Sequence, residues 1–214
     1  MPLTDPRELT EQWVATWVEL RGLRLEQVYG YPLVHVASAS RRTELVCLDP
    51  GVDRFLQLLR HVGGDSEGML TVAAPDISSY LAAPLPSDVR IDRDDESLMS
   101  TRLVDRQPIS LPPELHVRWE VGPSSTTCTL EDGQRVAAVG TVGVLDRVAT
   151  FDRIETTPAF RRRGLGRYLM TALTNHAVER GATHGVLAAS ADGRLLYAAL
   201  GWTTRLSLMS VMGV

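Results

Sequence analysis

The chain has 214 residues, of which 44% are hydrophobic and 22% are charged, so it can bury a core without disulfide or metal staples. This ordinary globular composition argues against a disordered or low-complexity chain. The 22 basic and 26 acidic side chains give a net charge of -4. Such a balance disfavours general nucleic-acid binding, which needs a basic surface to hold a phosphate backbone.

The sequence predicts neither a membrane partner nor export. No apolar run approaches the ~18 to 20 residues that cross a bilayer, and the first eight residues lack the profile of a signal peptide. We therefore expect a cytoplasmic protein. Cys47 and Cys128 lie far apart among apolar or β-branched residues, which favours buried thiols over a disulfide or a reactive site.

The first half has the pattern of a compact α/β unit. Leu9, Trp13, Trp17 and Leu20 share one face of a helix over 8–21, which Gly22 should end. The elements expected after it are a hairpin of strands 32–37 and 44–48 around the turn 38–43, a helix over 52–62 and a strand over 69–73. From these patterns we predict an N-terminal α/β domain over 1–86, then a proline-bracketed connector over 87–113 with room for one strand.

The second half, 114–214, is predicted to be a domain with the order β-β-β-β-α-β-α-β. Its first strand, 114–121, alternates apolar and polar residues, which is typical of a strand with one wet face. The other expected elements are strands at 126–131, 135–145 and 148–156, a helix at 164–180, a strand at 185–189, a helix at 192–200 and a strand at 206–211. The fold class is therefore α/β, with a mixed sheet.

The stretch from Pro158 to Arg167 carries the strongest chemical signal. It lies between a predicted strand and a long helix, where unpaired N–H groups of the first turn create a partial positive charge. Gly164 and Gly166 let a bulky phosphate approach the main chain, and the neighbouring arginines add positive charge. A pyrophosphate fits this chemistry, although a basic turn that merely caps a solvated helix has the same composition.

Two motifs together carry a family resemblance. The sequence Arg161-x-x-Gly164-x-Gly166 and, about 30 residues later, Tyr197-x-x-x-Gly201-Trp202 resemble the GNAT superfamily of acyl-CoA-dependent N-acetyltransferases. The resemblance implies a GNAT-like acyl-CoA-binding fold over about 114–214, with acetyl-CoA as cosubstrate and a small-molecule or peptide amine as acceptor. The smaller N-terminal domain is a candidate for a degenerate second copy of this fold, without an R-x-x-G-x-G loop.

The resemblance also implies roles for particular residues. Main-chain amides around Arg163 to Arg167 would hold the coenzyme pyrophosphate, and Thr156 would lie beside the pantetheine arm. Tyr197 matches the residue that often protonates the departing thiolate, although a core tyrosine is the alternative. The implied coenzyme-binding residues are Ile154, Thr156, Arg161, Arg162, Arg163, Gly164, Leu165, Gly166, Arg167 and Ser190, the last standing where the family commonly has Asn.

Asp152 aligns with a strand position that is often acidic in the family. It would share a strand face with Ile154 and Thr156, and it could take the proton of the amine directly or through a water. The alternative is a salt bridge with Arg153 or Arg147. Glu155 would point the other way unless a bulge intervenes.

One departure from the family pattern concerns the acceptor side. Family members insert two helices between their first two strands, whereas here only residues 122–125 separate the strands at 114–121 and 126–131. Either residues 1–113 supply the missing wall, or the first family strand lies earlier. A homodimer through the last strands is compatible with the resemblance.

The function predicted from these motifs is direct transfer of an acetyl group from acetyl-CoA to a primary amine. A non-catalytic acyl-CoA-binding or regulatory module is the alternative, and a protein-interaction domain that has lost the ligand is a third reading. No metal is expected, since the histidines show no metal-ligand spacing. Aminoglycosides, polyamines, amino acids and protein amino groups all remain open as acceptors.

Overall fold

The computed structural model describes residues 4–36, 38 and 40–214. Residues 1–3, part of the first eight residues that lack a signal-peptide profile, lie outside the described residues. The same holds for Ala37 in the predicted strand 32–37 and for Ala39 in the predicted turn 38–43.

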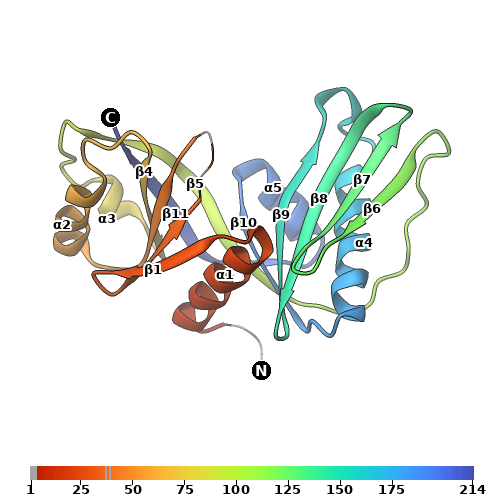
Figure 1. Ribbon diagram of the computed structural model, residues 1–214, viewed down its shortest axis with the longest axis horizontal. Helices are drawn as coiled ribbons and strands as arrows, with labels where there is room; N and C mark the ends of the chain where they lie inside the picture. The colour runs from red at the N-terminus through yellow and green to blue at the C-terminus, as the bar shows by residue number, and fades with distance from the viewer. Residues whose placement is uncertain (1–3, 37, 39) are drawn as a thin grey trace.

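The secondary structure of the described chain is helices packed on one large sheet (Figure 1). The helices are α1 (Pro6–Arg21), α2 (Val52–Val62), α3 (Ser78–Leu81), α4 (Leu165–Glu179) and α5 (Ala191–Ala199), with a short 3-10 helix η1 (Pro158–Phe160) before α4. The strands are β1 (Arg24–Val28), β2 (Tyr31–His35), β3 (Thr43–Leu48), β4 (Gly68–Ala74), β5 (Val89–Arg102), β6 (His116–Val121), β7 (Thr126–Asp132), β8 (Arg135–Leu145), β9 (Val148–Thr156), β10 (His184–Ala189) and β11 (Thr203–Gly213).

The described strands form one mixed sheet of eleven strands, in the order β1-β2-β3-β4-β11-β5-β10-β9-β8-β7-β6. Neighbouring residues of the central strand β11 enter different cores: Leu208 packs with α1, and Met209 packs on the opposite face with α2. One face of the sheet therefore carries α1, while α2 and α3 cover the other face in the first half and α4 and α5 cover it in the second (Figure 1). The predicted α/β class with a mixed sheet is confirmed.

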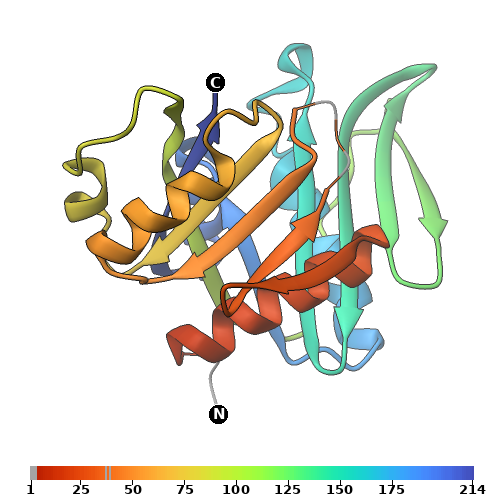
Figure 2. The same ribbon diagram turned by 60° about the vertical axis from the view of Figure 1, so that its left-hand side comes forward.

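Helix α1 shows how local sequence fixes an element that serves both halves. Asp5 accepts a hydrogen bond from the Glu8 N–H and Pro6 occupies the first turn, while Gly22 ends the helix with a left-handed φ of 60°. Trp13 and Trp17 are buried and stack with ring centroids 6.0 Å apart. The helix lies across strands of both halves, and its last turn reaches β8 and β9 (Figure 2).

The two halves repeat one succession of elements. The series β1-β2-β3-α2-β4-α3-β5 and the series β7-β8-β9-α4-β10-α5-β11 have the same order. They also have the same pairings: two antiparallel pairs are followed by a parallel pair around a helix. The last strand of each series pairs with the fourth strand of the other, so β4 meets β11 and β10 meets β5.

This exchange of strands revises several sequence-based expectations. The segment 87–113 carries one strand, as expected, but this strand, β5, has 14 residues and lies in the middle of the sheet. Strand β6 is an edge strand in which Trp119 and Val121 are exposed, so the predicted single wet face is wrong. Strand β11 pairs with β4 over 207–212 and with β5 over 203–213, and the homodimer through the last strands stays a prediction. The predicted boundaries at 86 and 113 stay a prediction, since β5 and β11 join the two regions in one sheet.

Candidate active site

The parallel strands β9 and β10 separate soon after they meet. Their pairing runs from Val148 opposite His184 to Thr150 opposite Val186, and the rest of β9 diverges from β10. In the first half, by contrast, β3 and β4 pair from Thr43 opposite Gly68 to Leu48 opposite Ala73. Of the two parallel pairs among the described strands, only β9 and β10 in the second half diverge to form a cleft.

A cavity of about 940 Å³ lies at this divergence. Its walls are the ends of β8 and β9, the loop before α4, the first turn of α4, and α5. Ten of the twelve predicted site residues line it: Ile154, Thr156, Arg161, Arg162, Gly164, Leu165, Gly166, Arg167, Ser190 and Tyr197. A pocket of this size falls within the range that binds small molecules and cofactors, about 300–1,000 Å³.

The first turn of α4 has the geometry of an anion site. Gly164 is the N-cap, with φ 78°, and no side chain caps the turn, so the first N–H groups of the helix are available to a ligand. A Cβ on Gly164 would meet nothing within 4 Å, so this glycine is required by its left-handed φ and not by a close neighbour. At Gly166 a Cβ would come within 2.9 Å of the Leu196 side chain.

The arginines beside this turn point to different places. Arg161, Arg162 and Arg167 line the cavity, and Arg162 has a left-handed φ of 63°, which costs conformational energy in a residue with a side chain. Arg163 is instead ion-paired with Glu114 and lies over the ring of Phe160. The Arg163 side chain is therefore directed to Glu114 and not into the cavity, and the role of its main-chain amide at the coenzyme stays a prediction.

Tyr197 stands in the cavity wall on α5, with 7% of its surface exposed. Burial, and then the negative charge of Asp152, raise the pKa of its phenol to about 12. The phenol is therefore protonated throughout the physiological range and can donate a proton to an acceptor in the cavity. Ser190, also in the wall, accepts a hydrogen bond from the Gly193 N–H and so caps α5.

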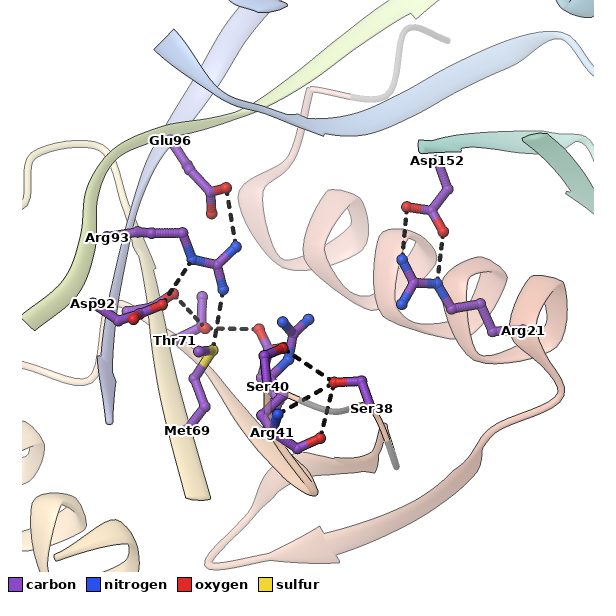
Figure 3. A network of polar contacts seen from close by, with 12 residues as sticks. Arg21, Ser38, Ser40, Arg41, Met69, Thr71, Asp92, Arg93, Glu96 and Asp152 are labelled. Carbon is purple, nitrogen blue, oxygen red and sulfur yellow. Dashed lines mark hydrogen bonds and ion pairs between the residues drawn. The ribbon is translucent and has the colours of Figure 1, made fainter. Parts of the chain in front are cut away.

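Asp152 lies outside the large cavity. Its two oxygens accept hydrogen bonds from Arg21 at the end of α1, at 2.6 Å from Nε and 2.9 Å from Nη2 (Figure 3). The predicted salt bridge of Asp152 with Arg153 or Arg147 is wrong. The observed partner is Arg21, which lies 131 residues earlier in the chain. No pattern local to Asp152 indicates this pair, because it depends on the packing of α1 against β9.

A bulge in β9 explains where Asp152 points. Asp152 lies opposite Thr141 and Glu155 opposite Val139, so Arg153 and Ile154 of β9 face the single residue Gly140 of β8. Arg153 has a left-handed φ of 51°. An extra residue reverses the faces beyond it. Asp152 therefore lies on the α1 face, whereas Ile154 approaches Gly140 on the α4 face. The prediction that Asp152 shares a face with Ile154 and Thr156 is wrong. A bulge does intervene, so Glu155 no longer points to the opposite face from Asp152.

A second, smaller cavity of about 340 Å³ lies on the α1 face at this bulge. Arg21, Asp152 and Arg153 line it, together with residues of α1, β7 and β8. The turn 122–125 packs against the end of α1, where Ser124 donates a hydrogen bond to Glu19. The end of α1 thus lies beside the short turn between β6 and β7.

Two further features were expected to be absent, a metal site and a membrane-spanning helix. No group of three or more His, Cys, Asp or Glu side chains in the described chain could hold a metal ion. None of the helices in residues 4–36, 38 and 40–214 is long and apolar enough to span a membrane.

Comparison with known proteins agrees with this geometry. A model of the acetyltransferase (GNAT) family matches residues 95–202, half of the chain. The chain belongs to the GNAT family, and it is an acyltransferase that uses an acyl-CoA donor. The match begins inside β5.

Solved structures share the fold over the whole chain. A GCN5-related N-acetyltransferase from Kribbella flavida is 16% identical, with a TM-score of 0.67, and the match covers 100% of this chain and 96% of that one. A GNAT-family protein from Novosphingobium aromaticivorans is 15% identical, with a TM-score of 0.62 and coverage of 100% and 99%. At such identities the likeness shows the fold alone. No curated protein matches the sequence.

Proposed function

We propose that the protein transfers an acetyl group from acetyl-CoA to a primary amine by direct attack. The observation that carries this proposal is the cavity where β9 and β10 diverge, which joins the uncapped start of α4 to the phenol of Tyr197. The donor's pyrophosphate would lie at the helix start, where N–H groups and the guanidinium groups of Arg161, Arg162 and Arg167 meet its charge. Ile154 and Thr156 would flank the pantetheine arm along β9.

The chemical step needs two groups of the chain. The amine nitrogen forms a bond to the thioester carbon, the C–S bond breaks, and Tyr197 gives its proton to the departing sulfur. The amine proton passes to solvent, and the Tyr197 phenolate takes a proton back from solvent before the next turnover. Asp152 would position the amine, since each of its oxygens keeps a lone pair besides the one that Arg21 uses.

The small cavity on the α1 face is the acceptor site in this proposal. The two cavities lie on opposite faces of the sheet at the bulge of β9, and adjacent residues line them, Arg153 the small one and Ile154 the large one. Asp152 influences the pKa of Tyr197 electrostatically, which supports a short path between them. Residues of α1 line the small cavity, which supports a catalytic protein over the non-catalytic module.

The test combines binding and turnover. Calorimetry should detect acetyl-CoA binding, and thiol release should rise on addition of an accepted primary amine. All 22 basic residues are arginine, so the chain offers no ε-amino group. Thiol release beyond one equivalent per chain without added amine therefore reports hydrolysis. Absence of acetyl-CoA binding would refute the proposal. Binding without thiol release across a broad amine panel would favour the non-catalytic module.

A further inference from the structure

The small cavity carries more positive than negative charge. Its charged lining residues are Arg21, Asp152 and Arg153, two cations and one anion. Arg21 is held in place because its guanidinium forms both bonds to Asp152 and also lies 5.7 Å from the ring centroid of Trp17. Arg21 is matched to Asp152, whereas the exposed Arg153 forms no ion pair with the described residues and is available to an anionic group of a ligand.

Arg153 is placed at this cavity by the bulge of β9. Its left-handed φ of 51° is unfavourable for a residue with a side chain, and it falls at the point where β9 leaves β10. The strained residue is also the one between the two cavities, since Asp152 lines the small one and Ile154 the large one. Strained residues that persist often mark ligand sites.

The remaining polar groups of the cavity are hydroxyls. Thr127 and Thr141 lie 3.0 Å apart, oxygen to oxygen, and Ser38 and Ser125 also line the wall. Such groups can both donate and accept hydrogen bonds, so they suit a polar ligand. A volume of about 340 Å³ is near the lower end of the range for ligand pockets, which favours a small molecule over a polymer.

We propose that the acceptor is a small amine that also carries a carboxylate, a molecule of the amino-acid class, bound with its amino group at Asp152 and its carboxylate at Arg153. This inference rests on the proposed function. Polyamines and aminoglycosides are disfavoured, because several cationic groups would meet the excess positive charge of the cavity.

The test uses matched pairs of acceptors that differ in the carboxylate. The panel contains the free proteinogenic α-amino acids and the corresponding α-carboxamides, with thiol release from acetyl-CoA as the readout. We expect kcat/KM for at least one free acid to exceed that of its amide by about 10- to 100-fold, the range for a hydrogen bond to a charged group. Arg153→Gln should remove most of this preference, mainly through KM of the acid.

Two controls separate this inference from the proposed function. Arg60→Gln removes one exposed arginine of α2, away from both cavities, and should leave the acid-to-amide ratio unchanged. Acetyl-CoA binding by Arg153→Gln, measured without acceptor, should match that of the native protein. A panel in which no carboxylate-bearing amine is acetylated, or in which acid and amide react equally, overturns the inference. Failure of the native protein to bind acetyl-CoA would overturn the proposed function itself.

Discussion

The Tyr80 hydroxyl accepts a hydrogen bond of 3.0 Å from the backbone N–H of Gly51, the N-cap of α2. The same hydroxyl donates to Asp49 at 2.6 Å. In the repeated succession of elements, α2 corresponds to α4 and α3 to α5, so Gly51 and Tyr80 take the places of Gly164 and Tyr197. Both glycines have φ 78°. The first half thus fills its helix start with its own tyrosine, where the second half leaves a cavity.

This difference predicts one coenzyme per chain. Because β3 and β4 stay paired over six residues and Tyr80 occupies the start of α2, the first half has no room for a pantetheine arm. Calorimetric titration with acetyl-CoA should give a stoichiometry of one. Two equivalent sites would contradict this reading.

Tyr80→Phe should destabilise the fold without changing catalysis. The substitution leaves Asp49 and the Gly51 N–H without their partner, so we expect a loss of about 1–3 kcal/mol in the free energy of unfolding. Urea denaturation measures this loss. The kcat of the variant should stay within about twofold of the native value, and a large fall in kcat at full acetyl-CoA saturation would show that Tyr80 serves the reaction.

Gly164→Val should abolish acetyl-CoA binding through both strain and obstruction. A β-branched residue is unfavourable at φ 78°, and its side chain would project from a residue that lines the cavity. Gly181, with φ 89° and equally open surroundings, does not line the cavity and offers a matched control. Gly181→Val should lower the melting temperature by a similar amount while binding acetyl-CoA normally. Equal binding by both variants would contradict the pyrophosphate placement.

Much of this fold could be predicted from the sequence because its elements carry local signals. Periodicity and end residues placed α1, α2 and α4 within two residues of their observed bounds, and Asp132-Gly133 correctly marked the turn between β7 and β8. The location of β5 between β10 and β11 could not be predicted, since its charged residues, such as Asp94 and Asp95, hide the strand pattern. Strand exchange depends on contacts far apart in sequence, which periodicity does not report.

The same distinction holds for the site. The arginine-glycine loop and Tyr197 could be found because a motif contains both the residues and their spacing. Arg21 could not be found, since it looks like an ordinary basic residue in the last turn of a helix. Its role depends on α1 crossing to β9 and on the bulge at Arg153.

Arg162→Gln and Arg163→Gln should differ although the residues are neighbours. Arg162 lines the cavity, whereas Arg163 pairs with Glu114. Losing one charge-assisted contact to a phosphate should weaken acetyl-CoA binding by Arg162→Gln about 10- to 100-fold, and the salt dependence of binding should become shallower. Arg163→Gln should change the dissociation constant by less than about threefold. The reverse order would mean that the loop rearranges to bring Arg163 to the ligand.

Cys47 and Cys128 should not react with thiol reagents in the native protein. Burial raises the pKa of each thiol to about 12, and the thiolate is the reactive species. At pH 8 the native protein should therefore give no signal with a chromogenic disulfide reagent, and the unfolded protein should give two equivalents. A rapid reaction of the native protein would show that one thiol is accessible.

Tyr197→Phe should lower kcat and leave acetyl-CoA binding nearly intact. Loss of a general acid typically costs about 10²- to 10⁴-fold, while the remaining ring keeps its packing against Trp202, at 6.1 Å between centroids. Because the pKa of Tyr197 is raised to about 12, the phenol keeps its proton as the pH rises to about 10, so its ionisation should cause no fall in native kcat below that pH. Tyr168→Phe is the matched control, since Tyr168 packs on the same core but does not line the cavity. Unchanged kcat in Tyr197→Phe would remove the phenol from the proton-transfer step and assign that step to solvent.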